Sequence, residues 1–235
     1  MKKQTVHQIV WYMLIFSILG LIVETIYGYA TTGILESRKG LILGPFCPIY
    51  GVGAVIILLL LDRFKGHKVK LFIYGAILGS FIEYILSFML EAMYGSRFWS
   101  YSNFMNTNGR ICLLYSAFWG VLSIILIEFV KKYIDKFIDK IKGKARIITD
   151  IALIIFFSVD ILLTVWGISV YKARAKDVYN DVKVFEEKNI IQKAGDAIFT
   201  DDIMSKIFPN LRLVDESGNE IWIKDIINNN KYVIK

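Results

Sequence analysis

Long apolar runs separated by short polar stretches occupy the chain up to about residue 171. A helix needs about 20 mostly apolar residues to cross about 30 Å of hydrocarbon, and four or five of these runs qualify. A soluble core would break its apolar residues into short patches, so we expect most of this region to lie in or against lipid. The second run is short, and its helix is expected to reach back toward Leu41. The expected segments are residues 6–29, 48–61, 71–93, 111–130 and 147–171.

The pattern divides the chain into a transmembrane domain, residues 1–171, and an extramembrane tail, residues 172–235. Between the fourth and fifth segments, at about 131–145, apolar residues recur at spacings of three and four. This predicts an amphipathic helix whose lysines face anionic headgroups, although a cytosolic continuation of the fourth segment is an equal alternative. The tail begins with a charged helical stretch, about 172–193, and later alternates around Gly218 and Asn219, which predicts a β-hairpin.

Lys and Arg residues are distributed unequally between the two ends of the expected helices. If the N-terminus is inside, 13 of them flank the inner side and 7 flank the outer side. Because positive charge gathers on the cytoplasmic side, we expect a cytoplasmic N-terminus. Five spans would then place the tail outside, whereas a re-entrant fifth segment would return it to the cytoplasm.

One motif occurs twice in the expected bundle. It reads Ile-Leu-Gly-x-x-x-Glu, then a loop, then Gly-x-x-Cys-x-x-Tyr, and it predicts an internal repeat that covers about 10–61 and 70–130. Both copies start on the same side, so the four helices would form a pseudo-twofold core with a site at the interface of the copies. The matching stretches are 18–24 with 77–83, and 44–50 with 109–115.

Two carboxylates, Glu24 and Glu83, lie within apolar runs, and Glu91 follows two turns after Glu83. A carboxylate at such depth costs several kcal/mol unless it is neutralised, paired or facing a wet cavity. The outer loops bring Arg38 and Arg110 to the same side, and a guanidinium binds a carboxylate with two hydrogen bonds. Three explanations remain open: ion pairs that fix the bundle, a binding pocket or translocation path, or catalysis by a carboxylate.

Several functional classes lack support. The net charge of +7 lies in clusters beside the apolar runs without an aromatic-basic recognition module, so membrane lipids and not nucleic acid are the expected partners. His7 and His67 both lie at membrane edges, which gives no zinc pattern, and no P-loop or dinucleotide fingerprint is present. We therefore expect no metal and no cofactor, and we assign no catalytic residue. Cys47 and Cys112 fit buried small side chains better than a disulfide.

The third loop contains aromatic side chains together with hydrogen-bonding groups. Trp99 and Tyr101 fit either an interfacial aromatic belt or a lid over a substrate, and Asn108 and Arg110 follow shortly after them. At the start of the second segment, Pro48 is expected to break or delay the helix.

At these residues the chain resembles a family of bacterial membrane proteins, the CmpB or type IV group of putative ABC-transporter permeases, over about residues 10–130. The resemblance implies a transport component, and an ATP-driven role would need a separate ATPase subunit. Because extended transporter permeases usually carry more helices, a homo-oligomer or a hetero-complex would also be needed. The family resemblance rests on these residues and segments: Glu24, 38–45, 48–51, Glu83-Tyr84, Glu91, 99–102, 108–113, Trp119-Gly120 and, in the tail, 208–212.

The sequence thus predicts an all-α integral membrane protein with about five transmembrane helices, a pseudo-twofold four-helix core and a small C-terminal α/β accessory tail. The favoured function is a multi-pass transport component of the cell membrane, with an intramembrane Glu/Arg site. The alternatives are a membrane-embedded enzyme that acts on lipid or cell-envelope substrates, and a structural or scaffolding protein. The residues expected to bind substrate are Glu24, Arg38, Tyr50, Glu83, Glu91, Trp99, Tyr101, Asn108 and Arg110.

Overall fold

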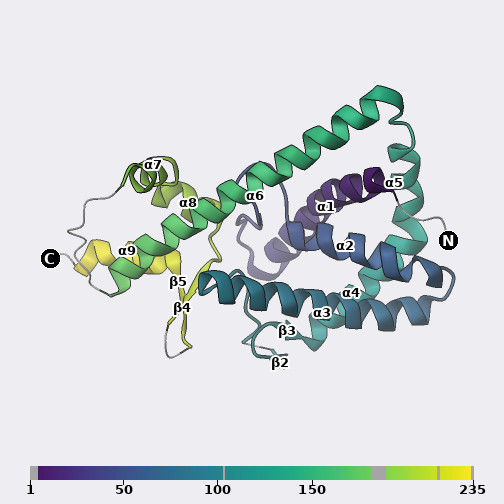
Figure 1. The fold of residues 1–235 in the computed structure, drawn as a ribbon. Coiled ribbons are helices and arrows are strands. Elements are labelled where there is room, and N and C mark those ends of the chain that lie inside the picture. The colour runs from purple at the N-terminus through teal and green to yellow at the C-terminus, as the bar shows by residue number, and fades with distance from the viewer. Residues whose placement is uncertain (1–4, 103, 181–188, 216–217, 234–235) are drawn as a thin grey trace.

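Long helices make up most of the computed structural model, which describes residues 5–102, 104–180, 189–215 and 218–233. The helices of the bundle run roughly side by side, and one long helix continues from the bundle into the tail (Figure 1). The bundle consists of α1 (Val6–Thr32), α2 (Pro48–Leu61), η1 (Asp62–Phe64), α3 (Lys68–Tyr94), α4 (Leu113–Ile124), the π-helical η2 (Ile125–Val130), α5 (Lys131–Ile138) and α6 (Gly143–Tyr179).

Among the described residues, four helical stretches are long and apolar enough to cross a membrane, in agreement with a predominantly helical membrane protein of about five spans. They are Val6–Thr32, Lys68–Ala92, Leu113–Ile138 and Gly143–Tyr179. The fifth apolar helix, α2, has only 14 residues and is about 21 Å long at 1.5 Å per residue.

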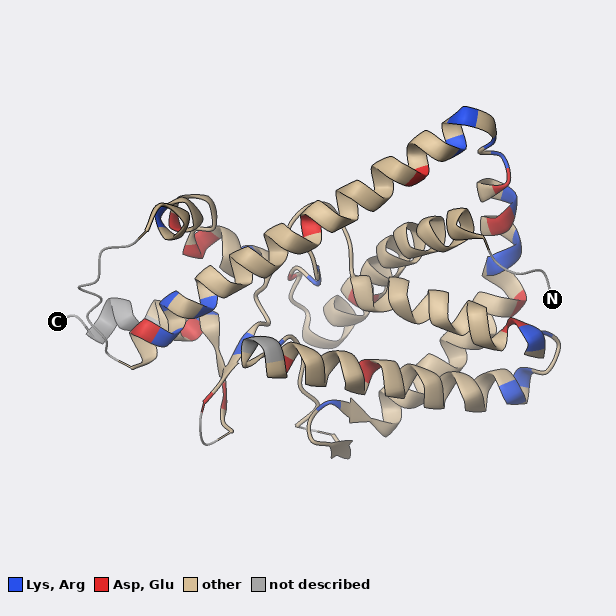
Figure 2. Cartoon of the chain, in the orientation of Figure 1, with Lys and Arg blue, Asp and Glu red and all other residues tan. Residues whose placement is uncertain are grey.

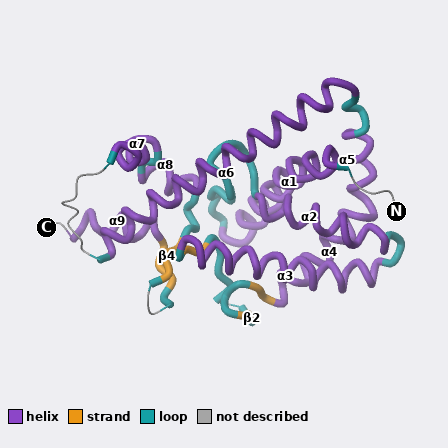
Figure 3. Tube along the Cα trace, in the orientation of Figure 1, coloured by secondary structure: helices purple, strands orange, loops and turns teal. Residues whose placement is uncertain are grey.

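The expectation that the second helix reaches back toward Leu41 is wrong. Helix α2 begins at Pro48, and its N-cap residue Cys47 has extended backbone angles. Proline cannot donate a backbone hydrogen bond and disfavours helical angles in the residue before it, which explains this boundary. Residues 33–47 instead form an irregular loop, drawn in teal in Figure 3, in which Gly44 has a φ of +69°.

Backbone hydrogen bonds hold the loop at 33–47 against α1 and α6. The Cys47 N–H donates to the Ser17 carbonyl of α1 at 3.0 Å, and the Leu43 N–H donates to the Asp160 carboxylate of α6 at 2.8 Å. Leu41 and Phe46 are buried beside it. Irregular backbone within a membrane protein is tolerated where the protein itself supplies such partners.

Helix α5 continues directly from α4 through the π-helical turn, so the backbone stays helical from Leu113 to Ile138. One side of α5 is buried at Ile134 and Ile138, while Tyr133 and Phe137 are exposed. Lys and Arg residues gather at this end of the bundle, close to η1 and the N-terminus (Figure 2).

The tail packs around the far end of α6. Its predicted β-hairpin is present as β4 (Arg212–Val214) and β5 (Glu220–Trp222), which pair antiparallel. Strand β1 (Ser96–Arg97), from the loop after α3, pairs with β4 and completes a three-stranded sheet. In the register of that pairing, Ser96 lies opposite Leu213 and Arg97 opposite Arg212. The predicted charged helix at about 172–193 corresponds to the end of α6, and its residues 181–188 lie outside the described parts. The remaining elements are α7 (Ile190–Ile198), α8 (Asp201–Ile207), α9 (Ile223–Val233), β2 (Asn106–Thr107) and β3 (Ile111–Cys112).

The described residues form two large apolar cores and a smaller one around Leu41, Phe46 and Phe157. One large core fills the bundle at the end where α5 lies, around Tyr12, Leu58 and Ile127, and the other large core joins the end of α6 to the tail, around Tyr171 and Met204. Between the two large cores lie the two long loops and the region where the candidate site is found.

Candidate functional site

A cavity of about 330 Å³ lies between the two large apolar cores. Its wall combines side chains of α1, α2, α3, α4 and α6 with the loops at 33–47 and 95–105, and the tail segment 208–211 closes it. Six of the nine residues predicted to bind substrate line this cavity: Glu24, Arg38, Tyr50, Glu83, Trp99 and Tyr101.

Glu83 is held in the cavity wall by two donors from other elements. The Tyr101 hydroxyl donates to Oε1 at 2.5 Å, and the Trp119 indole N–H donates to Oε2 at 3.2 Å. The Glu83 residue is only 5% exposed. Burial and the negative charges of Glu83 and Glu24 raise the pKa of the Tyr101 phenol well above its usual value, so Tyr101 remains a hydrogen-bond donor at physiological pH.

Glu24 is held in a similar way by one donor. The Tyr50 hydroxyl donates to its Oε2 at 2.6 Å. The Tyr50 ring stacks on Trp119 with centroids 5.6 Å apart, so the donors of the two carboxylates support each other. Tyr50 packs against α1 at Gly20, where an added Cβ would lie 2.2 Å from the Tyr50 ring. A glycine is therefore required for this close approach of α1 and α2.

Aromatic rings surround the two carboxylates. Tyr101 stacks on Tyr115 with centroids 4.6 Å apart, and Tyr115 meets Tyr27 edge to face at 5.8 Å. Phe118 also lines the cavity, and Glu24 lies on the wall that the main cavity shares with a smaller one of about 70 Å³. The sequence prediction does not include Tyr115 or Phe118, since aromatic residues are common in any apolar segment.

Two basic residues, Arg38 and Lys39, line the cavity from the loop at 33–47. Arg38 lies along α1 at Gly28, where a Cβ would come within 3.0 Å of its guanidinium. Within the described ranges, neither Arg38 nor Lys39 forms an ion pair with an acidic side chain. The expected pairing of Glu24 and Glu83 with arginines is therefore absent there, and phenol and indole groups hold both carboxylates instead.

The other three predicted residues, Glu91, Asn108 and Arg110, belong to an ion-pair network beside the cavity. Glu91 pairs with Arg97 and, at 2.9 Å, with Arg110. Arg97 also donates to the Asn108 carbonyl at 3.3 Å and to Glu220 of the tail at 2.6 Å. Hydrogen bonding to Glu91 and the charge of Glu220 raise the pKa of Arg97, so the network stays charged.

Arg110 is buried in this network. Its guanidinium lies over the rings of Tyr84 and Phe88, at 5.7 and 5.5 Å from their centroids. Its backbone carbonyl accepts the Trp99 indole N–H at 3.2 Å, which links the network to the cavity wall. The network therefore positions Trp99 and ties the tail to the bundle.

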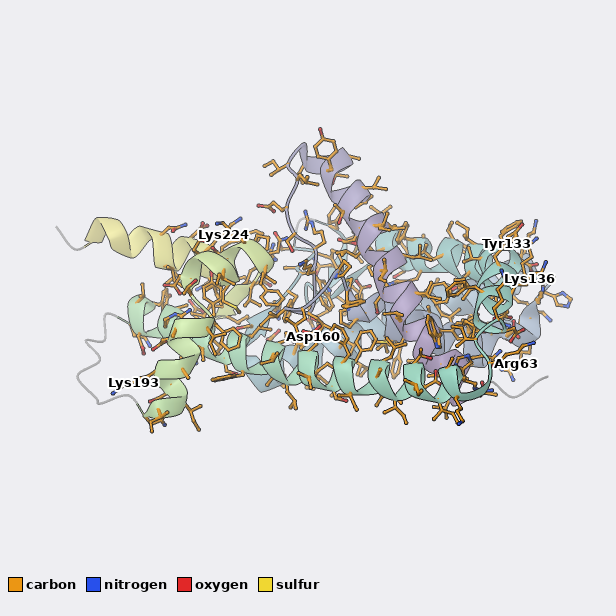
Figure 4. The ribbon with its side chains drawn as sticks, turned by 90° about the horizontal axis from the view of Figure 1, so that it is seen from above. Arg63, Tyr133, Lys136, Asp160, Lys193 and Lys224 are labelled. Atoms are coloured by element: carbon orange, nitrogen blue, oxygen red, sulfur yellow. The ribbon has the colours of Figure 1, made fainter. Side chains whose placement is uncertain are left out.

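Sequence reasoning missed Asp160, although it is an acidic residue within an apolar run, the same signal that identified Glu24 and Glu83. Asp160 lies in the middle part of α6 (Figure 4) and is fully buried. Its Oδ1 accepts the Leu43 N–H, and Thr164 accepts the Ile42 N–H at 3.0 Å. Asp160 and Thr164 thus supply acceptors for two backbone N–H groups of the loop at 33–47, which has no helical hydrogen bonds of its own. This loop also carries Arg38 and Lys39.

We expect Asp160→Leu to destabilise the protein by about 1–3 kcal/mol, because it leaves the buried Leu43 N–H without a partner. Asp160→Asn keeps an acceptor oxygen and should lose less stability. Thermal unfolding of the purified variants in detergent measures the difference. Equal stability of the Leu and Asn variants would contradict the role assigned to this hydrogen bond.

The comparisons with known proteins give one match. No curated protein and no solved structure matches the chain. A family model described as "Putative ABC-transporter type IV" matches residues 11–165, which include all the bundle helices except the start of α1 and the end of α6. The match covers well over half of the chain, and the chain belongs to this CmpB-type ABC-transporter family.

Proposed function

We propose that the chain is the membrane subunit of a transport system and that its cavity binds an amphipathic substrate. One observation carries this proposal: Arg38 and Lys39, neither of which forms an ion pair with a described residue, line a cavity whose other walls are largely apolar. Such a site suits a molecule with an anionic group and an apolar chain, because pockets with a few placed polar groups fix the orientation of a mostly apolar ligand. The apolar walls include Leu86, Leu90, Ile161, Val165 and Ile168.

The tail lies at the end of the bundle that is opposite to the N-terminus and α5 (Figure 1). The cavity lies between the tail and the core near α5. The excess of Lys and Arg at the α5 end supports a cytoplasmic position for that end. The tail, the loops at 33–47 and 95–112 and the cavity would then face the outer side of a bacterial cell membrane. This placement suits a multi-pass protein that receives its substrate from outside or from the outer leaflet.

A labelling experiment tests this orientation. Lys136→Cys lies on α5 and Lys193→Cys lies on α7, and both lysines are exposed at opposite ends of the molecule (Figure 4). We expect a membrane-impermeant maleimide to label Lys193→Cys in intact cells and Lys136→Cys only after lysis. The unsubstituted chain, whose two cysteines are buried, is the control. Labelling of Lys136→Cys in intact cells would show that the α5 end faces outward and would contradict the proposed orientation.

The internal repeat remains part of the proposal, and local geometry supports it. Gly44 and Gly109, which match in the motif, both have a φ of +69°. Cys47 and Cys112, which also match, both have extended backbone angles as the N-caps of α2 and α4. In each helix pair an aromatic donor of the second helix bonds the carboxylate of the first, although the donors, Tyr50 and Trp119, are not matching positions of the motif. The site would then lie where the two copies meet.

Transport would require partners or a rearrangement of the bundle. The half of the bundle near α5 is filled by a packed core, in which Tyr12, Leu58 and Leu71 are fully buried. This core separates the cavity from the α5 end in the conformation described. A separate ATPase, and a second membrane chain, are the partners that the family implies.

A binding experiment tests the proposed function. The probe is decyl phosphate, an anionic amphiphile, and the readout is the change in tryptophan fluorescence of the purified protein, since Trp99 and Trp119 line the cavity. We expect saturable binding that weakens at least about tenfold when Arg38 and Lys39 are both replaced by Gln, about 1.4 kcal/mol. Replacing Arg63 and Lys65, at the opposite end, is the matched control.

Whether the bound probe is chemically changed distinguishes a transport subunit from the alternative, a membrane-embedded enzyme. Mass spectrometry of the bound probe should recover it unchanged if the chain is a transport subunit. Release of inorganic phosphate from decyl phosphate by the wild type would favour the enzyme. Absence of saturable binding by the wild type would refute the proposed function.

A further inference from the structure

Neither Glu24 nor Glu83 forms an ion pair with another described residue. Both side chains line the cavity, Glu24 from α1 and Glu83 from α3. In the described part of the chain, each accepts hydrogen bonds only from neutral phenol or indole groups. Two carboxylates in largely apolar surroundings are costly without a counter-charge, so this part of the cavity is suited to a cationic group.

The carboxylates also keep room for further hydrogen bonds. A carboxylate has about four acceptor positions, and Glu24 uses one of them while Glu83 uses two. Oε1 of Glu24 has no donor within the described ranges. A ligand with several N–H groups, or with a methylated nitrogen that needs only negative charge nearby, can be placed against both side chains.

The aromatic rings identify the kind of cation. Tyr50, Tyr101, Tyr115, Phe118 and Trp119 all line the cavity beside the two carboxylates. Aromatic faces attract ammonium groups, and clusters of them are a recurring way to bind alkylated ammonium ions. A metal ion is a poorer match, because no group of three or more His, Cys, Asp or Glu side chains that could hold one occurs in the residues the structure describes. Calcium, for comparison, takes about 6–8 oxygen ligands.

The two polar parts of the cavity therefore have opposite charge. Arg38 and Lys39 supply a positive part from the loop at 33–47, while Glu24 and Glu83 supply a negative part from α1 and α3. Apolar side chains complete the wall. A single ligand that satisfies all three regions carries an anion, an ammonium group and a hydrocarbon chain.

We propose that the cavity binds a zwitterionic amphiphile, with its ammonium group against Glu24 and Glu83 and its phosphate or other anionic group at Arg38 and Lys39. This inference rests on the proposed function and names the substrate class of the same cavity. A volume of about 330 Å³ is within the range of small-molecule sites and suits a headgroup with the first part of its chains.

Two short-chain phospholipids with identical chains and phosphate test the ammonium group directly. Dihexanoyl phosphatidylcholine carries it, and dihexanoyl phosphatidylglycerol carries a neutral glycerol in its place. We expect the wild type to bind the choline lipid more than about tenfold tighter in the tryptophan fluorescence titration. In Glu24→Gln and in Glu83→Gln the ratio of the two dissociation constants should fall toward one, because glutamine keeps the shape of the side chain and removes its negative charge.

The control variant is Glu128→Gln, which removes a carboxylate from η2 that accepts the Gly66 N–H far from the cavity. It should keep the wild-type preference. Since the preference is a ratio measured within one variant, a loss of folded protein does not imitate the result. Glu24 is also less buried than Glu83, so Glu24→Gln supplies a second, milder variant.

Four further outcomes separate the inference from the function on which it rests. Equal affinity of the wild type for the two lipids, with binding still dependent on Arg38 and Lys39, would overturn the ammonium site and leave the amphiphile site standing. Decyltrimethylammonium bound as tightly as the choline lipid would overturn the zwitterionic assignment. Phosphocholine without chains bound as tightly as the lipid would show a soluble ligand and would also overturn it. Failure of every probe to saturate would refute the proposed function itself.

Discussion

Replacement of Trp119 by alanine is expected to destabilise the bundle by about 3–5 kcal/mol, the usual cost of removing a large buried aromatic side chain. Trp119 is 5% exposed and fills the space beside α2 and α3, where its ring excludes any side chain at Gly53 and Gly79. It also stacks on Tyr50 and donates to Glu83. The substitution therefore removes apolar packing and, in addition, one of the two donors that hold the Glu83 carboxylate.

Unfolding of the purified protein by increasing SDS in mixed micelles measures this loss. Phe118→Ala is the matched control, because the neighbouring ring lines the same cavity but makes no hydrogen bond and is less buried. Trp119→Phe separates packing from the hydrogen bond, since it keeps most of the ring and removes the indole N–H. A loss for Trp119→Ala no larger than that for Phe118→Ala would contradict the central position given to Trp119.

The membrane helices could be predicted from the length of the apolar runs, because hydrocarbon thickness imposes that length directly. The start of α2 was predicted less well. The run at 48–61 is short for a full span, which suggested a helix that reaches back toward Leu41, but Pro48 and the positive φ of Gly44 interrupt it. The buried acceptor Asp160, more than 100 positions later in the sequence, stabilises this irregular loop, and no local pattern indicates such a distant partner.

The candidate site, like the fold, could be predicted from the sequence only in part. The cost of a carboxylate in an apolar run identified Glu24 and Glu83 from the sequence, and both line the cavity. Their partners were not identified, because the rule that a buried charge needs a partner does not say which kind. Arg110 is bound by Glu91 instead, and aromatic donors nearer to the carboxylates take its place.

The sequence pattern also did not predict that the tail contributes to the site. Strand β1 has only two residues, Ser96 and Arg97, and forms only because β4 lies beside it. This pairing, together with the bond between Arg97 and Glu220, brings the segment 208–211 over the cavity. Short strands of this kind depend on tertiary contacts and carry no detectable period.

The second large effect is expected for Glu91→Leu, which should destabilise the protein by about 3–5 kcal/mol. The Glu91 side chain is 22% exposed, but its partner Arg110 is buried, and removing Glu91 leaves that buried charge without compensation, which costs more than the pair contributes. Arg110 is only 7% exposed, and without Glu91 its only remaining hydrogen-bond acceptor among the described side chains is the Ser87 hydroxyl at 3.3 Å. Its Nε has no hydrogen-bond partner among the described residues even with Glu91 present. SDS-induced unfolding measures the loss.

A surface pair supplies the control for Glu91→Leu. Glu36 and Lys224 also join a loop of the bundle to the tail, at 3.2 Å, but their side chains are 28% and 31% exposed. Water replaces much of such an interaction, so Glu36→Leu should cost at most about 1 kcal/mol. Since Glu91 also holds Arg97, which bonds Glu220 of the tail, Glu91→Leu should make the tail more sensitive to limited proteolysis than Glu36→Leu does. If both variants lost the same small amount of stability, Arg110 would have found water or another partner, and the network would not be the anchor between the tail and the bundle.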